Sequence, residues 1–423
     1  MHYFTHLICL IFILSKTMLA QELNEIITYN TDNSGLTFNQ IHCIEFDDSN
    51  RLWIGTENGL NVFETENNTW LNFNTTNTPW TNFPTNQIKS MEWANELSNM
   101  LIGTSEGIVK YIESGEELTE NNTESIWIPS FGNSCSPNNS IINCLLYHEG
   151  LWSGSADGLC IQYLGAEGNW LNLNDSENLY SNNFTSIKKN PNNDIIGIGT
   201  VNGGLIIYDG EFNVYYSGNS DILDNSVLDL VFDDNNNILI STPQAGLGIL
   251  TYEGSWIWLN TENSEISSNS LQNITVDNNN NLWITTLENG LINYKNNTFY
   301  NYNTENSNLP DNKINCLKFG PNNNLWLGTN NSGLVKITNP TLNITSQEKK
   351  EKCVFPTIFN YEINIELNNY STIQIISQQG KLLKQISLES GIHQINTTQL
   401  DSGVYFILIQ TENYNLVEKI IKY

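Results

Sequence analysis

The chain has 423 residues, of which 39% are hydrophobic, and its formal net charge is -28 at neutral pH. Its 18 Tyr, 16 Phe and 11 Trp residues can fill a large core, so we expect a folded chain, and the length allows two or more domains. The acidic surface repels phosphate groups and anionic lipid headgroups, which disfavours nucleic acid as a partner and leaves cations and neutral glycans open; the same charge also keeps a secreted protein soluble.

Residues 1–20 predict a cleaved secretory signal. An apolar segment runs from Leu7 to Leu14, and the small residue Ala20 precedes Gln21. No later segment has the roughly 18 uninterrupted apolar residues that a membrane-spanning helix requires, so we expect no membrane span in the mature protein. The acidic excess follows the signal: residues 22–344 carry 37 acidic and 9 basic side chains, against 8 and 7 in residues 345–423.

The segment LWIGTENGL, residues 52–60, recurs in related forms such as LWSGSADGL from Leu151 and LWLGTNNSGL from Leu325. Seven hydrophobic anchors, spaced by 48, 51, 44, 43, 44 and 43 residues, mark the repeats: Trp53, Leu101, Trp152, Ile196, Leu239, Trp283 and Trp326. A period in the forties built from short β-patterned segments is typical of propeller blades, whereas a helical solenoid shows 3.6-residue apolar spacing. The sequence therefore predicts an all-β chain with a seven-bladed β-propeller over residues 21–337.

Each repeat is interpreted as four strands, which in the first repeat are 41–46, 52–56, 60–63 and 69–73 from the inside outward. Asx-rich turns, such as DDSN from Asp47, join the first two strands and suit tight hairpins. Calcium loops are the alternative for these turns, but the turns lack the ligand register and the distal Glu of an EF-hand. A glycine with an expected positive φ follows the Thr or Ser that ends each second strand: Gly59, Gly107, Gly158, Gly204, Gly246, Gly290 and Gly333.

The N-terminal stretch NEIITYNTDNSGL matches the outer strands of two repeats, TWLNFNTTNT from Thr69 and TFYNYNTENSNL from Thr298. The seventh repeat ends at its third strand near Ile337. We therefore expect the strand around residues 26–29 to complete the seventh blade and to cover both free sheet edges.

The LWIGT-x-x-GL pattern, together with an Asn two residues before most inner strands, resembles the two-component regulator propeller repeats. The Asn residues are Asn39, Asn86, Asn182, Asn225, Asn269 and Asn312, with Ser140 in the third repeat. The resemblance covers roughly residues 22–337. In that family the propellers are mostly periplasmic sensory regions fused to a membrane span and a histidine kinase, so the resemblance implies a sensory role, although this sequence carries neither of those parts.

Residues 338–352 are interpreted as a polar linker, and a second β-rich unit follows over residues 353–423. Alternating strands and Gly-marked turns, such as QQGK from Gln378, predict a small β-sandwich of about seventy residues. One interpretation of this unit is a permanent structural β-sandwich.

The tail resembles the type A C-terminal sorting domain of type IX secretion substrates. The matching residues are Pro356, Gly380, Gly403, Tyr405, Lys419 and Lys422. The usual proline-asparagine-proline opening of that family is here Pro356-Thr357-Ile358. The resemblance implies the type IX secretion machinery and its sortase as partners, export across an outer membrane, removal of the tail, and release or attachment at the cell surface.

Six cysteines remain after the signal, and they form no CxxC and no Cys/His cluster with metal spacing. Cys43, Cys144 and Cys316 occupy one position in three repeats, where other repeats have Ser or Asx residues. This pattern indicates a site that requires a small side chain, so buried free thiols are favoured over disulfides.

No catalytic residue, metal site or cofactor is predicted. The sequence has no G-x-S-x-G, P-loop, HExxH or Rossmann motif, and its isolated histidines after the signal are typical of structural histidines: His42, His148 and His393. Four acids take equivalent places in the hairpins between second and third strands: Glu57, Glu106, Asp157 and Glu288. Such acids would suit acid–base catalysis or a cation, but a ring of this kind is more often solvated.

A ligand-binding face is expected where these hairpins meet the loops between blades. Its candidate residues offer carboxylates and amides to sugar hydroxyls or a cation: Glu57, Asn58, Glu106, Asp157, Asn202, Gln244, Glu288 and Asn330. Trp80, in the loop between the first two blades, is the Trp that the repeat does not explain, and it either stacks on a glycan or folds that loop against blade two.

Taken together, these features predict a secreted or surface-attached binding or adhesion module for a glycan or protein ligand. The alternative is an extracellular sensor subunit of a two-component system. A glycan-degrading enzyme is the third possibility, and the fold alone decides none of these.

Overall fold

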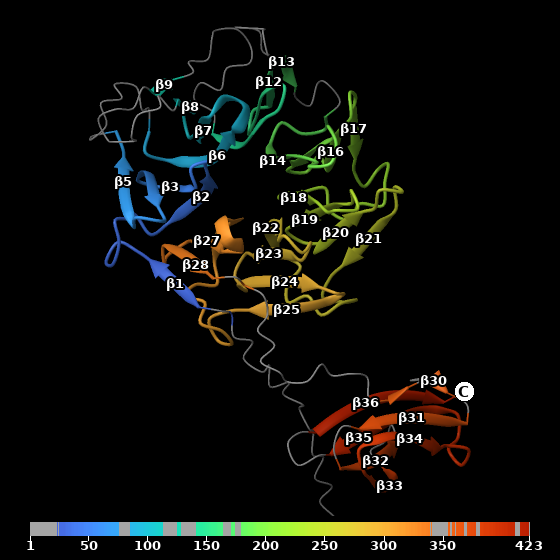
Figure 1. Ribbon diagram of the computed structural model, residues 1–423. Helices are drawn as coiled ribbons and strands as arrows, with labels where there is room; N and C mark the ends of the chain where they lie inside the picture. Colours follow the sequence, from blue (N-terminus) through green and yellow to red (C-terminus); the bar gives the residue numbers. More distant parts are fainter. Residues whose placement is uncertain are drawn as a thin grey trace, which may run out of the picture. The chain divides into compact units, whose positions relative to one another are not determined.

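Figure 1 shows the computed structural model of the chain. It describes residues 23, 25–75, 85–112, 125–127, 141–163, 171–173, 179–338, 340, 354–355, 358–359, 361–367, 370–377, 381–410 and 415–422. The predicted signal peptide, Trp80, Pro356 and Gly380 lie outside these residues. The chain forms two compact units, Met1–Leu342 and Asn343–Tyr423.

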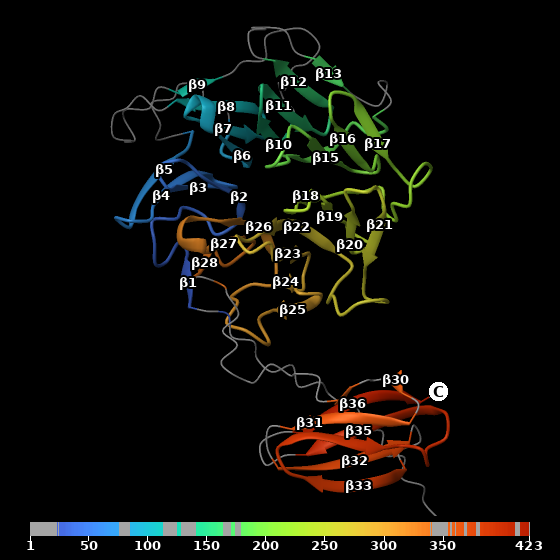
Figure 2. The same ribbon diagram turned by 45° about the vertical axis from the view of Figure 1, so that its right-hand side comes forward.

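The first unit is a ring of antiparallel sheets, the blades, and its described residues form seven sheets of four strands each (Figures 1 and 2). Within a blade the first strand lies innermost. Blades one to three contain β2 (Ile41–Phe46), β3 (Arg51–Thr56), β4 (Gly59–Glu64) and β5 (Thr69–Phe73); β6 (Ile88–Ala94), β7 (Asn99–Thr104), β8 (Gly107–Ile112) and β9 (Ser125–Trp127); and β10 (Ile142–Tyr147), β11 (Gly150–Ser155), β12 (Leu159–Tyr163) and β13 (Leu171–Leu173).

The remaining blades repeat this order. They contain β14 (Phe184–Lys189), β15 (Ile196–Thr200), β16 (Leu205–Tyr208) and β17 (Phe212–Tyr215) in blade four; β18 (Asp229–Phe232), β19 (Ile238–Ser241), β20 (Leu247–Leu250) and β21 (Trp256–Leu259) in blade five; β22 (Leu271–Val276), β23 (Leu282–Thr286), β24 (Leu291–Lys295) and β25 (Thr298–Tyr302) in blade six; and β26 (Ile314–Phe319), β27 (Leu325–Thr329) and β28 (Leu334–Ile337) in blade seven. Two short 3-10 turns, Asn95–Leu97 and Pro321–Asn323, join inner to second strands.

The core lies between neighbouring blades, where second strands such as β3, β7 and β11 are buried along their whole length. Ile196 is not the anchor of blade four. It pairs with Tyr208 as Leu52 pairs with Phe63, so Gly197 takes the position of Trp53. A Cβ on Gly197 would lie 2.8 Å from the Leu230 side chain, and a larger residue at this position would therefore collide with blade five.

The recurring pattern of a Thr or Ser followed three or four residues later by Gly has one hydrogen bond as its physical cause. The hydroxyl that ends each second strand donates to the carbonyl of the hairpin glycine, as Thr56 does to Gly59 at 2.8 Å. Gly59 has a φ of 114°, and a Cβ there would lie 2.6 Å from the Phe73 carbonyl oxygen. The same bond recurs in the other six blades, from Thr104, Ser155, Thr200, Thr242, Thr286 and Thr329.

The Asn before an inner strand fastens the hairpin of the preceding blade. The Asn312 carbonyl accepts a hydrogen bond from the Gly290 amide at 3.0 Å, while its side-chain oxygen accepts one from the Thr304 amide at 2.8 Å. The same pair of bonds is made at Asn39, Asn86, Asn225 and Asn269. These bonds confirm that the hairpins and the between-blade loops lie on one face of the ring.

Strand β1 (Ile26–Tyr29) closes the ring, which confirms the predicted role of the N-terminal segment. It pairs antiparallel with β28, in a register from Ile26 opposite Ile337 to Tyr29 opposite Leu334. The ring of Tyr29 also lies 5.1 Å from that of Phe63 and stacks on Trp326 at 6.1 Å, measured between ring centroids. Blade seven is therefore assembled from both ends of the propeller.

The second unit contains two sheets, β29 (Val354–Phe355), β31 (Glu362–Leu367) and β34 (Gly391–Asn396), and β30 (Ile358–Phe359), β36 (Asn415–Lys422), β35 (Gly403–Gln410), β32 (Ser371–Ser377) and β33 (Leu382–Leu388). Ile363, Ile373 and Ile407 belong to its buried core. The buried Lys422 ammonium donates to the carbonyls of Thr397 and Leu400 at 2.7 and 2.6 Å. This sequence-predicted Lys therefore holds the loop before β35, and the Tyr405 hydroxyl does the same by donating to Asp401.

Cys43, Cys144 and Cys316 are free thiols, as predicted. Burial raises the pKa of both Cys144 and Cys316 to about 12. Each sulfur lies where a Cβ on the glycine of the adjacent strand would collide with it, which explains why a small residue and the Gly of LWIGT occur together. Cys160, which does not occupy this repeat position, is disulfide-bonded.

Candidate functional site

The inner strands begin around a cavity of about 340 Å³, which we call the mouth cavity. Its lining comprises His42, Lys89, Asn143, Leu228, Gln272, Asn273 and Asn315. Apart from Asn273, each of these residues holds the same position in its blade, directly after the buried residue at the start of the inner strand; in blade five this residue and Leu228 precede β18. Because six blades contribute to one cavity, the cavity lies at the axis of the ring, at the mouth of the central channel.

A β-bulge turns these side chains toward the axis. The pairing of β2 with β3 shifts between Ile41 and Cys43, and His42 is the extra residue. The same shift occurs at Lys89 and Asn143. The extra residue interrupts the alternation of inward-facing and outward-facing side chains at the start of the inner strand.

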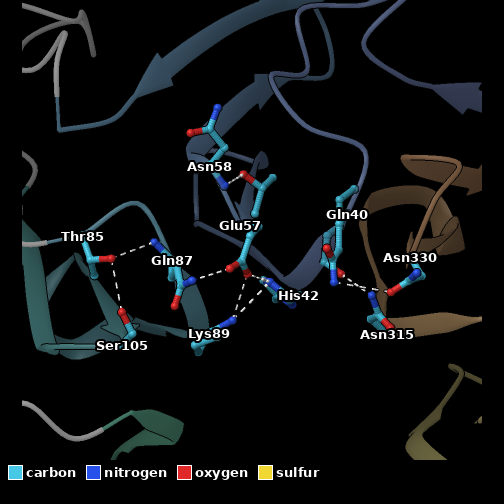
Figure 3. Close-up of polar contacts among 12 residues, drawn as sticks. Gln40, His42, Glu57, Asn58, Thr85, Gln87, Lys89, Ser105, Asn315 and Asn330 are labelled. Atoms are coloured by element: carbon cyan, nitrogen blue, oxygen red, sulfur yellow. Dashed lines mark hydrogen bonds and ion pairs between the residues drawn. The ribbon is translucent and has the colours of Figure 1, made fainter.

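His42, Glu57 and Lys89 form a charged cluster on one side of the mouth cavity (Figure 3). The Glu57 carboxylate lies 2.6 Å from His42 Nε2 and 3.1 Å from Lys89 Nζ, and it also accepts a hydrogen bond from Gln87. Desolvation opposes ionisation of Glu57, but the His42 and Lys89 hydrogen bonds outweigh it and lower the pKa of this carboxyl. Burial lowers the pKa of His42 below its ordinary value of 6.5, so its imidazole is mainly neutral at pH 7.

Several polar side chains near the mouth join adjacent blades. Asn315 Nδ2 donates to the Ile41 carbonyl at 2.9 Å, and Asn143 Nδ2 donates to the Phe184 carbonyl at 3.0 Å. Equivalent bonds run from Ser90 to Ile142 and from Asn273 to Asn315. These amides and hydroxyls thus stabilise the ring, and they are only partly free to bind a ligand.

The Gln272 side chain differs from these amides, since in the described part of the chain it makes no hydrogen bond. It lines the mouth cavity with both a donor and an acceptor available. Gln272 therefore offers the cavity a donor and an acceptor that no other described residue uses, and Lys89, although paired with Glu57, adds a cation.

A second charged layer lies three residues further along the inner strands, at Glu45, Glu92, Lys188 and Lys318. Lys318 Nζ lies 2.7 Å from Glu45 Oε2. Desolvation lowers the pKa of Lys318, but the carboxylates of Glu45 and Glu92 outweigh this effect and raise it. Burial first, and the Glu45 carboxylate second, raise the pKa of Glu92 to about 7, against the effect of Lys318 and Lys188.

The residues predicted for the ligand-binding face all lie in second-to-third-strand hairpins, except Trp80, which lies outside the described residues. Glu57 contacts residues of the mouth cavity. Three of the others make hydrogen bonds at the hairpins. Asn330 Oδ1 accepts a long bond of 3.4 Å from Gln40, Asn202 Oδ1 accepts one from the Ser226 hydroxyl, and the backbone N–H of Gln244 donates to the Asp224 carboxylate. Asn58, Glu106, Asp157 and Glu288 are hairpin residues that do not line the cavity.

Sequence reasoning missed the inner-strand residues. It treated His42 as an isolated structural histidine, whereas His42 contacts Glu57 at the mouth. The available signal was the shared position of His42, Lys89 and Gln272 within the repeat. Among the described residues, no group of three or more His, Cys, Asp or Glu side chains is placed to hold a metal ion, and no helix is long and apolar enough to cross a membrane.

Comparison with protein families gives two matches. Residues 35–58 and 308–331 match the two component regulator propeller model, and residues 353–423 match the secretion system C-terminal sorting domain model. The chain carries two component regulator propeller repeats and a C-terminal sorting domain. A sorting domain of this type directs export across the outer membrane by the type IX system, with attachment to the surface or release. A search of curated protein sequences finds no significant match.

Solved structures with the same fold support the propeller assignment. The extracellular domain of a proposed hybrid two component system from B. thetaiotaomicron is 17% identical, with a TM-score of 0.62 over 94% of this chain and 57% of that chain. PorZ, a surface component of the type-IX secretion system of Porphyromonas gingivalis, is 16% identical, with a TM-score of 0.55 over 93% of this chain and 61% of that chain. The chain thus spans about three fifths of the length of both.

A third structure is an enzyme. Virginiamycin B lyase from Staphylococcus aureus is 10% identical, with a TM-score of 0.54 over 74% of this chain and 99% of that chain. At these identities the likeness concerns the fold alone, which hosts both binding proteins and enzymes.

Proposed function

We propose that this protein is an exported recognition module whose propeller binds a hydroxyl-rich glycan at the mouth cavity. The observation that carries the proposal is the convergence of six inner strands, which place His42, Lys89, Asn143, Leu228, Gln272 and Asn315 around one cavity of about 340 Å³. This volume falls within the range of small-molecule pockets. Amides and an ammonium group match sugar hydroxyls, which both donate and accept hydrogen bonds.

Binding rather than catalysis is the proposed role. The His42 ring contacts Glu57 and Lys89, and among the described residues it contacts no hydroxyl or thiol that it could activate as a nucleophile. Glu57 is held ionised by its partners, which makes it a hydrogen-bond acceptor rather than a general acid at neutral pH.

A glycan array on the secreted protein tests the proposal, with two matched variants. Gln272→Ala removes an amide from the mouth cavity that has no internal partner, so we expect the fold to persist and glycan binding to fall about tenfold, the loss of one or two hydrogen bonds. Gln244→Ala makes the same change on the hairpin of the neighbouring blade, outside the cavity, and should leave binding intact. If only Gln244→Ala weakens binding, the ligand lies on the hairpins and the mouth cavity is the wrong site.

A sensor subunit is the second candidate, and the match to the two component regulator propeller model favours it. In that case the bound propeller would contact a separate membrane protein. Co-purification of a membrane histidine kinase with the protein, dependent on the glycan found on the array, would distinguish the sensor from a simple adhesion module.

A further inference from the structure

The anchor residue of each second strand faces the next blade, and four of the seven anchors are Trp. Trp53 lies 5.0 Å from Tyr111, Trp152 lies 5.2 Å from Tyr208, and Trp326 lies 6.1 Å from Phe63, measured between ring centroids. The three partners hold one position in the third strand of the next blade, opposite Met100, Ile196 and Leu52. An indole between adjacent blades, packed on this ring, thus recurs at three of the seven joints. The fourth Trp anchor, Trp283, faces a blade with Ile337 at the partner position and packs on Phe319 instead.

Blades two, four and five have no Trp anchor. The partner position in the next blade is Gln162 for blade two and Leu250 for blade four, so of these three blades only blade five faces a partner ring. Its anchor is Leu239, while the next blade keeps the partner ring, since Tyr294 lies opposite Leu282 as Tyr111 lies opposite Met100. Tyr294 stacks instead on Phe299 of its own blade, with ring centroids 4.5 Å apart. The position that an indole fills elsewhere is therefore occupied by a shorter aliphatic side chain.

A groove of about 950 Å³ lies at this joint, between blades five and six, which lie side by side in Figures 1 and 2. We call it the blade 5–6 groove. Its apolar wall comprises Leu239, Ile249, Ile257, Leu259, Val276, Tyr294 and Phe299. The joint between blades four and five has no equivalent space at its anchor, because the Leu230 side chain occupies the place where a Cβ on Gly197 would project.

Carboxamides form the rim of the groove. Asn235 and Asn279 lie in the turns after the inner strands of blades five and six, and Asn296 lies in the hairpin between β24 and β25. Within the described part of the chain, these three side chains make no hydrogen bond, whereas the nearby Asn237 and Asn281 amides are bonded to Asp233 and Asp277. A carboxamide presents one acceptor and an NH2 donor, which match the N–H and C=O of a peptide group.

We propose that the blade 5–6 groove binds a large aromatic side chain, of the size and shape of Trp, presented by a protein or peptide partner. The ring packs against Tyr294, as the indoles pack on the equivalent rings at three other joints, and lies beside Leu239. Asn235, Asn279 and Asn296 bind the peptide groups beside it. A buried aromatic anchor surrounded by polar contacts is the usual composition of an interaction hot spot. This site is independent of the mouth cavity.

The experiment uses the full secreted protein and the probe N-acetyl-L-tryptophanamide, which carries one indole and two peptide groups. Calorimetric titration should detect binding with a Kd on the order of 1 mM, and N-acetyl-L-alaninamide should not bind. Leu239→Trp supplies the missing indole from within, so it should raise the melting temperature without probe and weaken probe binding at least tenfold. Leu239→Met, which conserves volume, should bind as the wild type does.

Three further variants make the result decisive. Val276→Phe fills the groove from blade six and should block the probe even if Leu239→Trp does not fold. Asn279→Ala should weaken N-acetyl-L-tryptophanamide but not free indole, because the amide contacts only the peptide groups. Gln272→Ala, at the mouth cavity, should leave probe binding unchanged. Absence of probe binding to the wild type, or equal binding to the wild type and the filled variants, would overturn the proposal.

Discussion

Lys318 on blade seven lies 2.7 Å from Glu45 on blade one, inside the central channel. The two residues belong to the first and last inner strands of the ring. The joint at which β1 closes the propeller on its outside is therefore also bridged on its inside by an ion pair. Glu45 is mostly buried, so its carboxylate depends on this partner.

The Lys318–Glu45 pair should couple the ends of the ring. Lys318→Gln alone leaves a largely buried carboxylate without its cation, and we expect a loss of about 1–2 kcal/mol in the free energy of unfolding, less than for a fully buried pair because Lys318 is partly exposed. Glu45→Gln with Lys318→Gln should recover much of that loss. A double-mutant cycle by urea unfolding measures the coupling, and additive effects of the two changes would show that the pair contributes nothing.

Glu92 should make stability decrease as the pH rises from about 4.5 to about 7. Its pKa is about 7 in the folded protein against an ordinary value of 4.5, so the folded state binds more protons in this window and deprotonation favours unfolding. His42, whose pKa is lowered from 6.5, acts in the opposite direction below pH 6.5, and Glu57, whose pKa is lowered from 4.5, acts in the opposite direction only below pH 4.5. The difference in the free energy of unfolding between the wild type and Glu92→Gln, followed as a function of pH, isolates the effect of Glu92.

Urea midpoints at pH 5 and pH 8 test this prediction. The advantage of Glu92→Gln over the wild type should grow by about 2 kcal/mol between these values, from the shift in pKa. A constant difference between the two proteins would mean that Glu92 does not titrate in this range.

Tyr29 is expected to be the main side-chain contact of the closing strand. Tyr29→Ala removes a ring that packs against Phe63, Trp70 and Trp326, and we expect it to lower the free energy of unfolding by about 2–4 kcal/mol. Tyr252→Ala, at an exposed turn of blade five, serves as the control and should change stability by less than about 0.5 kcal/mol. Equal effects of the two substitutions would contradict the role of β1 as the clasp.

Export should leave a shortened chain. Because the sorting domain is removed in the proposed processing, the secreted protein should lack residues 1–20 and the tail from about Cys353. Intact-mass measurement of material from cells with a working type IX system decides this. Exported protein that keeps its tail would mean that this β-sandwich is a permanent domain.

The fold was predictable because each blade needs the same local contacts. The Thr56 to Gly59 hydrogen bond and the two bonds of Asn312 recur around the ring, so their residues recur in the sequence. The anchor of blade four was misplaced because Gly197 stands at the anchor position, where most blades have a hydrophobic residue. The neighbouring Ile196 is hydrophobic and therefore matched the pattern of the anchors. The Leu230 side chain of blade five fills the space beside Gly197, so the sequence of the fourth repeat alone does not mark this position as part of the core.

The mouth cavity was only partly predictable. Glu57 was identified from its hairpin position, but His42, Lys89 and Gln272 were not, because a bulge at the start of the inner strand breaks the two-residue alternation that reveals which side chains face inward. The charged layer of Glu45, Glu92, Lys188 and Lys318 was missed for another reason. Its members come from four blades, and their proximity depends on ring closure rather than on sequence spacing.

The structure of the protein with the glycan that binds best on the array tests the central claim most directly. The account predicts that the sugar lies in the mouth cavity, with hydroxyls within hydrogen-bonding distance of the Gln272 amide and the Lys89 ammonium. A glycan bound on the outer rim of the ring, with the mouth cavity unchanged, would contradict it.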